Sequence, residues 1–240
     1  MKFWRLFIRN LKETYRDIAA LGFLLAFPLL FMVVFGAAFS SADQLDFLAP
    51  GIIVFGLMIM IPTSSRILAR DREKDFLTRM LTTPTRPWEF IAGYGLCMLL
   101  VAAVQIVFFV LIGYAYGVDI TGSIALAFAI LLLTALASIG VGMIIGSIAK
   151  SENQAEPLTW LFSMPLAALS GVWFSTDSMP AYLRTIAGVF PYSHSVDAAR
   201  EVISSGAGLA AVQNDVLFLA GWAAGSILLG IFFFARTMRS

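Results

Sequence analysis

The chain alternates long apolar runs with short charged segments. Ionisable side chains are missing from six windows, at residues 18–42, 47–65, 90–118, 120–149, 157–176 and 216–235. About 20 apolar residues are needed to cross about 30 Å of hydrocarbon as a helix, and each window meets or nearly meets this length. Since backbone groups in lipid must be satisfied within their own segment, the spans should be helical. The pattern predicts an all-α integral membrane protein with transmembrane helices at about 20–39, 48–65, 90–116, 122–149, 157–175 and 213–235.

Composition agrees with a membrane protein. Hydrophobic residues make up 60% of the 240 residues, charged residues only 13%, and the mean hydropathy is +0.88. An average soluble domain carries about 25% charged residues, so the composition excludes that class.

The distribution of lysine and arginine predicts the orientation. Five of these residues lie in residues 1–17 and six in 66–89, whereas only Arg184 and Arg200 fall on the opposite side of the predicted membrane. Positive charge is retained on the cytoplasmic side. Both termini and the charged segment 66–89 are therefore expected in the cytoplasm.

The first 17 residues predict an amphipathic helix that lies in the cytoplasmic headgroup layer, where its cations match anionic lipid. Apolar and cationic side chains fall on separate stripes of such a helix. The apolar stripe is Trp4, Phe7, Ile8, Leu11 and Tyr15, and the cationic stripe is Arg5, Arg9, Lys12 and Arg16.

A second amphipathic helix is predicted inside the loop 66–89. Its apolar stripe is Phe76, Leu77, Met80 and Leu81. Pro84 ends it, because the residue before a proline is disfavoured in the helical conformation. Lying at the membrane surface between two spans, this helix is either a plain connector or a docking surface for a soluble partner.

The outer segment 176–212 is too long for a simple loop. It contains two short amphipathic stretches, one ended by Pro191 and the other by Ser204-Ser205-Gly206. They predict a helical hairpin that either re-enters the outer leaflet or caps the bundle at its surface.

The six apolar windows contain no Asp, Glu, Lys, Arg or His, and this absence reduces the number of possible function classes. Without ionisable groups at span depth, a proton-coupled or ion-coupled carrier and an intramembrane hydrolase are both disfavoured. His194 is the single histidine and is expected at a helix start, and the single Cys97 permits no intrachain disulfide. No GxxxxGK[ST] phosphate loop occurs, so energy for transport would have to come from a partner.

Polar groups near mid-depth are few, and aromatic and thioether side chains are plentiful. Such a lining suits an amphipathic or lipid-like ligand better than an ion. The residues expected along a substrate path are Gln105, Thr134, Ser138, Ser163, Trp160 and Met164.

The chain resembles the permease subunits of type-2 ABC exporters along essentially its whole length. The features that carry the resemblance are the N-terminal amphipathic helix, the six spans, and three stretches of sequence. These stretches are Arg72 to Pro84 (REKDFLTRMLTTP), Leu169 to Phe174 (LSGVWF), and Phe190 to Glu201 (FPYSHSVDAARE). The chain departs from the family where Lys74-Asp75-Phe76 replaces a Gly-Thr-Leu-Glu-like run and where Ser175 replaces a proline.

The resemblance implies a single permease domain over residues 1–240, in the inner membrane of a prokaryote. It implies two cytosolic ABC ATPase subunits that bind ATP and Mg²⁺, a second identical or similar permease, contact with membrane lipid, and no nucleic-acid partner. The chain itself would hold no cofactor or metal and would not be an enzyme. The inner helix would be the coupling helix, and the outer hairpin would flank the exit. The coupling residues would be Arg70, Arg72, Glu73, Phe76, Leu77, Met80, Leu81 and Glu152, and the exit residues Pro180, Pro191, Tyr192, Asp197 and Arg200.

The expected function is export of a small amphipathic or lipid-like substrate by alternating access. Sodium and lipid-linked glycans are alternative substrates within the same family. A carrier that works without ATP and a membrane scaffold without flux are the alternatives from other classes.

Overall fold

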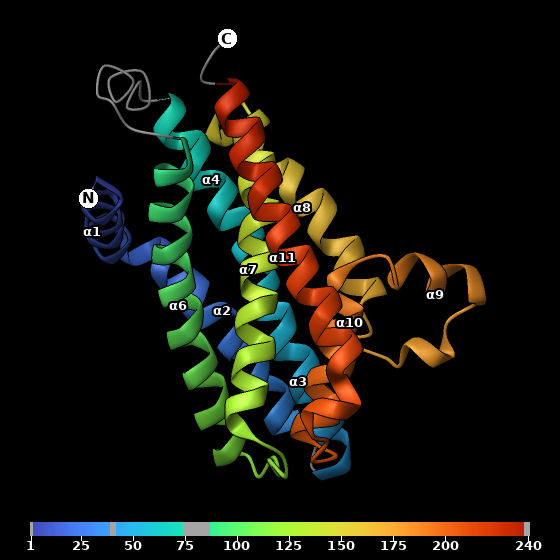
Figure 1. Ribbon diagram of the computed structural model, residues 1–240. Coiled ribbons are helices and arrows are strands. Elements are labelled where there is room, and N and C mark those ends of the chain that lie inside the picture. The colour runs from blue at the N-terminus through green and yellow to red at the C-terminus, as the bar shows by residue number, and fades with distance from the viewer. Residues whose placement is uncertain (1, 39–41, 74–86, 238–240) are drawn as a thin grey trace.

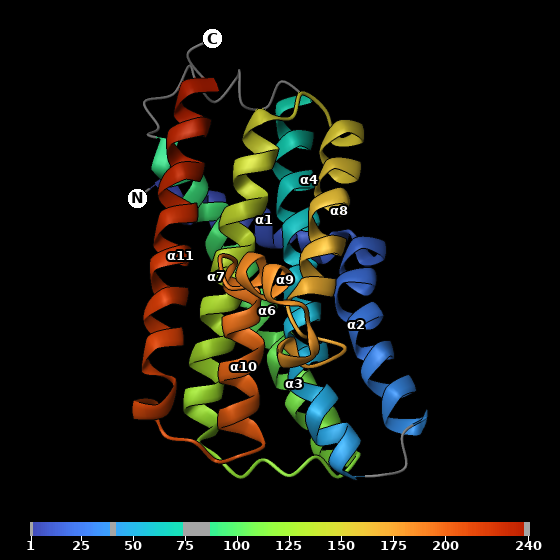
Figure 2. The same ribbon diagram turned by 90° about the vertical axis from the view of Figure 1, so that its right-hand side faces the viewer.

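A computed structural model describes residues 2–38, 42–73 and 87–237 of the chain, and within these ranges the fold is built of helices. The long helices stand side by side in one bundle, with α1 lying across it (Figures 1 and 2). The helices are α1 (Lys2–Arg16), α2 (Ile18–Ala38), α3 (Ala42–Met58), α4 (Met60–Glu73), α6 (Pro87–Ala115), α7 (Ile124–Ile148), α8 (Glu152–Leu169), the 3₁₀ turn η1 (Thr176–Ser178), α9 (Ala181–Ala187), α10 (Pro191–Ile203) and α11 (Leu209–Thr237).

Two ends of the bundle can be distinguished. At the inner end, α7 packs against α4, α8 and α11, and Thr237 of α11 donates a hydrogen bond to the carbonyl of Ser147 of α7 at 3.1 Å. At the outer end, the α6–α7 turn meets α10, and the Thr121 amide donates to the Ile203 carbonyl at 3.0 Å. The inner end is the one that the charge distribution predicts to be cytoplasmic.

Helices α3 and α4 form the central element, an almost continuous apolar helix from Gln44 to Glu73 that is buried along most of its length. It breaks at Ile59, because Pro62 has no amide hydrogen to donate to the Met58 carbonyl and its ring crowds that turn. Helix α4 then continues to Glu73 without interruption. The sequence analysis placed a boundary between residues 65 and 66, whereas the structure places residues 66–73 in the same helix as the end of the second predicted span.

Helix α1 packs against α6 across the inner half of the bundle. A Cβ atom added at Gly93 of α6 would lie 2.9 Å from the Leu6 Cβ, so the two helices approach closely there. Leu6, Phe7 and Asn10 are buried, while Trp4 and Tyr15 are exposed. The predicted helix is therefore present, but its buried face differs from the predicted apolar stripe.

Within the described residues, five helices are long and apolar enough to cross a membrane, at Leu21–Ala38, Gln44–Glu73, Pro87–Ala115, Ile124–Ile148 and Leu209–Thr237. They match five of the predicted spans and confirm an all-α membrane protein. The remaining predicted span, 157–175, corresponds to α8, which begins with the polar turn Glu152 to Glu156 and ends at Leu169. A sixth crossing stays a prediction.

The outer segment folds into η1, α9 and α10. Helix α9 projects from the side of the bundle, whereas α10 packs against α11 and α7 and runs back to the outer end (Figure 1). Tyr192, Val196, Ala199 and Val202 of α10 are buried in the bundle. The segment is therefore not a symmetric hairpin, because one short helix belongs to the core and the other stands outside it.

Candidate functional site

The inner end of the bundle is held by ion pairs and helix caps within the chain. Arg66 of α4 lies 3.2 Å from the Glu152 carboxylate at the start of α8. Glu73 accepts a hydrogen bond from the Glu152 amide at 3.1 Å. A carboxylate at a helix N-terminus satisfies a free amide and matches the helix dipole. Ser151 makes no such side-chain bond, so Glu73, 79 residues away in sequence, caps α8 in its place.

Arg72 performs the corresponding role at the end of α7. Its Nη1 donates to the carbonyl oxygens of Ser147 at 3.3 Å and Ala149 at 3.1 Å. A cation at a helix C-terminus pairs with carbonyls that have no partner inside the helix. Arg72 and Glu73 together fix α4 to the ends of two neighbouring helices.

A second network joins α4 to α1 and α6. Asp71 is buried and accepts hydrogen bonds from Arg9 and from the hydroxyl of Tyr94. Arg9 also lies 2.9 Å from Glu13, and Arg70 lies 3.7 Å from Asp17. Arg9 therefore points into the bundle and not toward the lipid headgroups, which corrects its place on the predicted cationic stripe.

The predicted coupling residues separate into two groups. Arg70, Arg72, Glu73 and Glu152 lie together at the inner end, each with a partner inside the chain. The predicted apolar stripe of Phe76, Leu77, Met80 and Leu81 falls outside the described residues. Whether any of these residues contacts an ATPase stays a prediction.

A lateral groove opens between α2, α4 and α8 in the inner half of the bundle. Its volume is about 310 Å³. The groove combines charged and aromatic side chains, as a site for an amphipathic ligand would. Its lining residues are Asp17, Phe23, Ile59, Pro62, Thr63, Arg66, Glu156 and Trp160.

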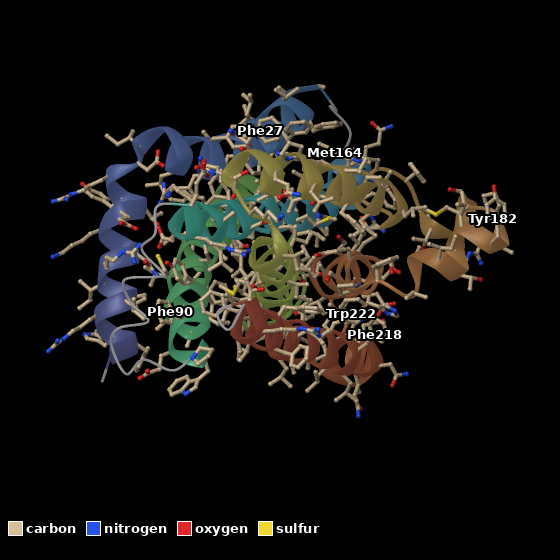
Figure 3. The ribbon with its side chains drawn as sticks, turned by 90° about the horizontal axis from the view of Figure 1, so that it is seen from above. Phe27, Phe90, Met164, Tyr182, Phe218 and Trp222 are labelled. Carbon is tan, nitrogen blue, oxygen red and sulfur yellow. The ribbon has the colours of Figure 1, made fainter. Side chains whose placement is uncertain are left out.

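Of the residues predicted along a substrate path, only some lie on this side of the molecule. Trp160 lines the groove, and Met164, one turn further along α8, is exposed. Figure 3 looks down the bundle and places Met164 of α8 and Phe27 of α2 on the same side.

The other predicted path residues are buried and bonded inside the bundle. Gln105 donates to the Leu24 carbonyl at 3.3 Å, and Thr134 donates to the Ser195 hydroxyl at 2.8 Å. Ser138 donates to the Tyr192 hydroxyl at 3.4 Å, and Ser163 bonds within its own helix. Three of these groups join helices to one another, and none of the four lines the groove.

Sequence reasoning missed most of the groove. Asp17, Arg66 and Glu156 fall at the edges of apolar windows, where charged residues were assigned to the membrane surface. One signal was available, because Phe23, Phe27, Phe31 and Phe35 recur every four residues and therefore lie on one face of a helix. The sequence alone does not say whether such a face is buried.

Two of the predicted exit residues, Asp197 and Arg200 of α10, lie close together, with 3.9 Å between their charged groups. Arg200 makes the wider set of contacts. Its Nε donates to the Phe47 carbonyl at 3.2 Å and its Nη2 to the Gly171 carbonyl at 3.2 Å. The guanidinium carbon also lies 3.9 Å from the centre of the Phe47 ring. Partial burial lowers the pKa of Arg200, and the nearby Asp197 opposes that shift. Arg200 thus ties α10 to α3 and to the segment that follows α8.

The prolines and the tyrosine of the predicted exit occupy structural positions. Pro191 is the first residue of α10, where its missing amide costs nothing, and Tyr192 is buried beside Ser138. Pro180 directly precedes α9. His194, in the first turn of α10, lies 2.6 Å from the Asp215 carboxylate of α11 and 3.1 Å from the Gly188 carbonyl. His194 was not among the predicted site residues, yet it links three elements of the outer half.

Stability should depend on the protonation of Asp197. Burial raises its pKa to about 6, against the opposing effect of Arg200. The folded chain therefore keeps this proton at pH values where the unfolded chain has lost it, so stability falls as the pH rises from about 3.8 to about 6. In Asp197→Asn the melting temperature should rise relative to wild type at pH 7.5 and should match it more closely at pH 5. Because the carboxyl is 45% exposed, the difference should be small. A difference in melting temperature between the two proteins that does not change with pH would contradict this prediction.

Comparison with known proteins decides the family. Residues 1–204 match the model of the ABC-2 type transporter family. The chain belongs to the ABC-2 type transporter family.

Several curated relatives are ABC permeases. The chain is 30% identical over 179 residues to the probable multidrug ABC transporter permease YbhR of Escherichia coli K12, covering 73% of this chain and 48% of the relative. It is 29% identical to the inner membrane transport permease YhhJ of the same organism, covering 75% and 49%. It is 26% identical to the daunorubicin resistance permease DrrB1 of Streptomyces coeruleorubidus, covering 77% and 67%. The chain spans about half the length of the first two relatives.

Proposed function

We propose that this ABC-2 family chain is the transmembrane subunit of an ATP-driven exporter. Its substrate is a small amphipathic or lipid-like compound, taken from the cytoplasm or the inner leaflet. The observation that carries the proposal is the lateral groove of about 310 Å³ between α2, α4 and α8. The names of the relatives, which include multidrug and daunorubicin resistance permeases, support the same class of function.

The two halves of the bundle differ in a way that suits uptake from the inner side. The groove opens laterally in the inner half, so a membrane-dissolved compound reaches it without leaving the lipid. In the outer half the chain is closely packed, and the apolar cavity among Met32, Phe109 and Ile203 has a volume of only about 30 Å³. That volume holds about one water molecule. Export requires this outer packing to open.

The central helix offers a mechanical link between the energy source and the groove. Helix α4 carries the groove residues Thr63 and Arg66 and ends at Glu73, which caps α8. A force applied at the inner end therefore moves α4 and α8 together, and these helices form two of the groove walls. We place two ATPase subunits at this end, with ATP and Mg²⁺ bound by them, and a second permease beside this one.

Transport then follows from a shift between two conformations. ATP binding draws the ATPase subunits together and favours a bundle in which the groove is closed inward and open outward. A ligand shifts such an equilibrium only through a difference in its affinity for the two states. Hydrolysis and release restore the inward-open state.

Proteoliposomes that contain the permease and its cognate ATPase test this function. Amphipathic compounds or lipids should stimulate ATP hydrolysis and be transported, whereas sodium and small hydrophilic sugars should do neither. The double variant Leu77→Ala/Leu81→Ala serves as a control, because it removes predicted ATPase contacts outside the groove. It should still bind substrate but lose the stimulation.

Two experimental outcomes would contradict the proposed function and indicate a different one. Stimulation by sodium alone, with coupled sodium flux, would indicate ion export. Flux that persists without the ATPase would indicate a carrier that is independent of ATP.

A further inference from the structure

Among the described residues, the charges along the groove are not balanced by partners. Arg66 is paired with Glu152 at 3.2 Å, and Asp17 lies 3.7 Å from Arg70. Glu156 is exposed, and among the described residues its carboxylate has no hydrogen bond or ion pair. The lining therefore presents one carboxylate whose charge no described residue of the chain neutralises.

An aromatic face lies one helical turn from that carboxylate. Glu156 and Trp160 are four residues apart on α8, so their side chains share one face of the helix, and both line the groove. Phe23 faces them from α2 and is about half exposed, at 49%. A carboxylate beside exposed aromatic rings is the arrangement that attracts organic cations, since both the negative charge and the ring faces favour positive charge.

From Phe23 at the groove, a row of partly buried aromatic rings runs along α2 toward the outer end. The ring centroids of Phe23 and Phe27 are 4.9 Å apart, and those of Phe27 and Phe31 are 5.1 Å apart. Phe31 then lies 5.9 Å from Trp173, in the segment after α8. We call Phe23, Phe27, Phe31 and Trp173 the aromatic ladder. It follows α2 along the side of the bundle that carries Phe27 and Met164 in Figure 3.

We propose that this groove selects positively charged amphiphiles whose charge is spread over an apolar or aromatic body. The proposal rests on the exporter function proposed above and specifies its substrate class. Glu156 attracts the cation at the inner mouth, Trp160 and Phe23 bind its apolar body, and the aromatic ladder offers further ring faces along α2. The ladder residues carry no carboxylate that could pair with a cation beyond Glu156. A compact ammonium ion would lose its hydration there without compensation, whereas a cation with delocalised charge has less hydration to lose.

The same residues disfavour anions. An anionic amphiphile at the mouth would meet Glu156 as a like charge, and ring faces carry negative electrostatic potential. Arg66 is the cationic residue of the lining, and it is already paired with Glu152. Charge sign, and not only shape, should therefore govern binding.

A matched pair of probes isolates the sign of the charge. Tetraphenylphosphonium and tetraphenylborate have nearly the same size and apolar surface but opposite charge. Binding is measured by equilibrium dialysis with the full chain in lipid nanodiscs, after subtraction of binding to empty nanodiscs. Wild type should bind the cation about tenfold more tightly than the anion, as expected for one partly desolvated carboxylate acting with cation–π contacts.

Two variants assign that preference to the groove. Glu156→Gln keeps the shape and removes the charge, so most of the tenfold preference should disappear. Phe23→Leu keeps an apolar side chain and removes a ring face of the groove lining, so it should weaken binding of the cation several-fold and leave binding of the anion unchanged. Glu201→Gln, an exposed carboxylate at the outer end, is the matched control and should change neither probe. Melting temperatures check that each variant is folded.

Equal binding of the two probes by wild type would overturn the proposal, and so would an unchanged cation preference in Glu156→Gln. The dialysis needs no ATPase. A failure of ATP-driven transport would therefore disprove the exporter function while leaving a measured cation preference intact.

Discussion

Replacing Asp71 with alanine is expected to lower the free energy of unfolding by about 3 kcal/mol, or the melting temperature by roughly 10 °C. Asp71 is 4% exposed and is the shared acceptor for Arg9 and Tyr94. Its removal takes one acidic partner from Arg9, which keeps Glu13 at 2.9 Å, and leaves the Tyr94 hydroxyl without its acceptor in the interior. An uncompensated buried group costs its full desolvation energy, which exceeds the net value of the bond that is lost. Thermal unfolding of the purified chain in detergent measures the effect.

The matched control is Asp119→Ala, because Asp119 is exposed in the turn between α6 and α7. Its melting temperature should stay within the range typical of surface substitutions, about 0.5 kcal/mol of wild type. If both variants melted at the same temperature, the buried network would make no special contribution to stability.

The network of Arg9, Asp71 and Tyr94 also shows that the periodicity of a helix does not predict which of its residues contact the rest of the protein. The sequence placed Arg9 among the cations of an interfacial stripe, since a helical pattern sorts residues only by polarity. Asp71 lies 62 residues further along the chain, and only the packing of α1 beside α4 and α6 brings the two together. The existence of α1 followed from local pattern, while its buried face depended on partners distant in sequence.

The long spans were predictable because hydrocarbon imposes a length and an apolar composition on each segment separately. The break at Ile59, which Pro62 causes, and the continuation of α4 to Glu73 were not predicted, although each has a simple cause. The charges at residues 66–73 suggested a helix on the membrane surface. In the structure they extend the central helix, since the ends of α7 and α8 and the acidic residues of α1 provide partners for them.

The candidate path residues illustrate a related limit. Gln105, Thr134 and Ser138 attracted attention as rare polar groups in apolar helices, and polar groups in membranes often mark function. They can equally be satisfied by hydrogen bonds between helices, as Thr134 is by Ser195. The phenylalanines of the aromatic ladder were present in the sequence as a four-residue repeat, but how far each ring is exposed depends on the helices packed around α2.

Glycine pairs with identical spacing have different environments in this chain. Gly142 and Gly146 face α4, where an added Cβ at Gly146 would lie 2.7 Å from the Ser65 carbonyl oxygen. An added Cβ at Gly221 or Gly225 of α11 would meet nothing within 4 Å. Small residues four apart allow two helices to approach closely, but they do so only where another helix lies against that face.

Gly146→Ala is therefore expected to destabilise the protein, although alanine is the better helix former by about 1 kcal/mol. The new methyl group would push against the backbone of α4, which cannot rotate away as a side chain can. Overpacking of this kind costs about 1–3 kcal/mol, so a net loss of about 1 kcal/mol should appear in thermal unfolding. The substitution should also reduce ATP-driven transport, because it separates α4 from α7 at the level where Arg72 holds the two helices together.

Gly225→Ala provides the contrast, since it adds the same methyl group in the same helical context to open space. Its stability should equal or exceed that of wild type by up to about 1 kcal/mol, because the gain in helix propensity is not opposed by a clash. A difference between the two variants would come from the α4–α7 contact alone. Equal stabilities would mean that α4 can move aside at no cost, and α4 would then be too loosely held to transmit force from the inner end to the groove.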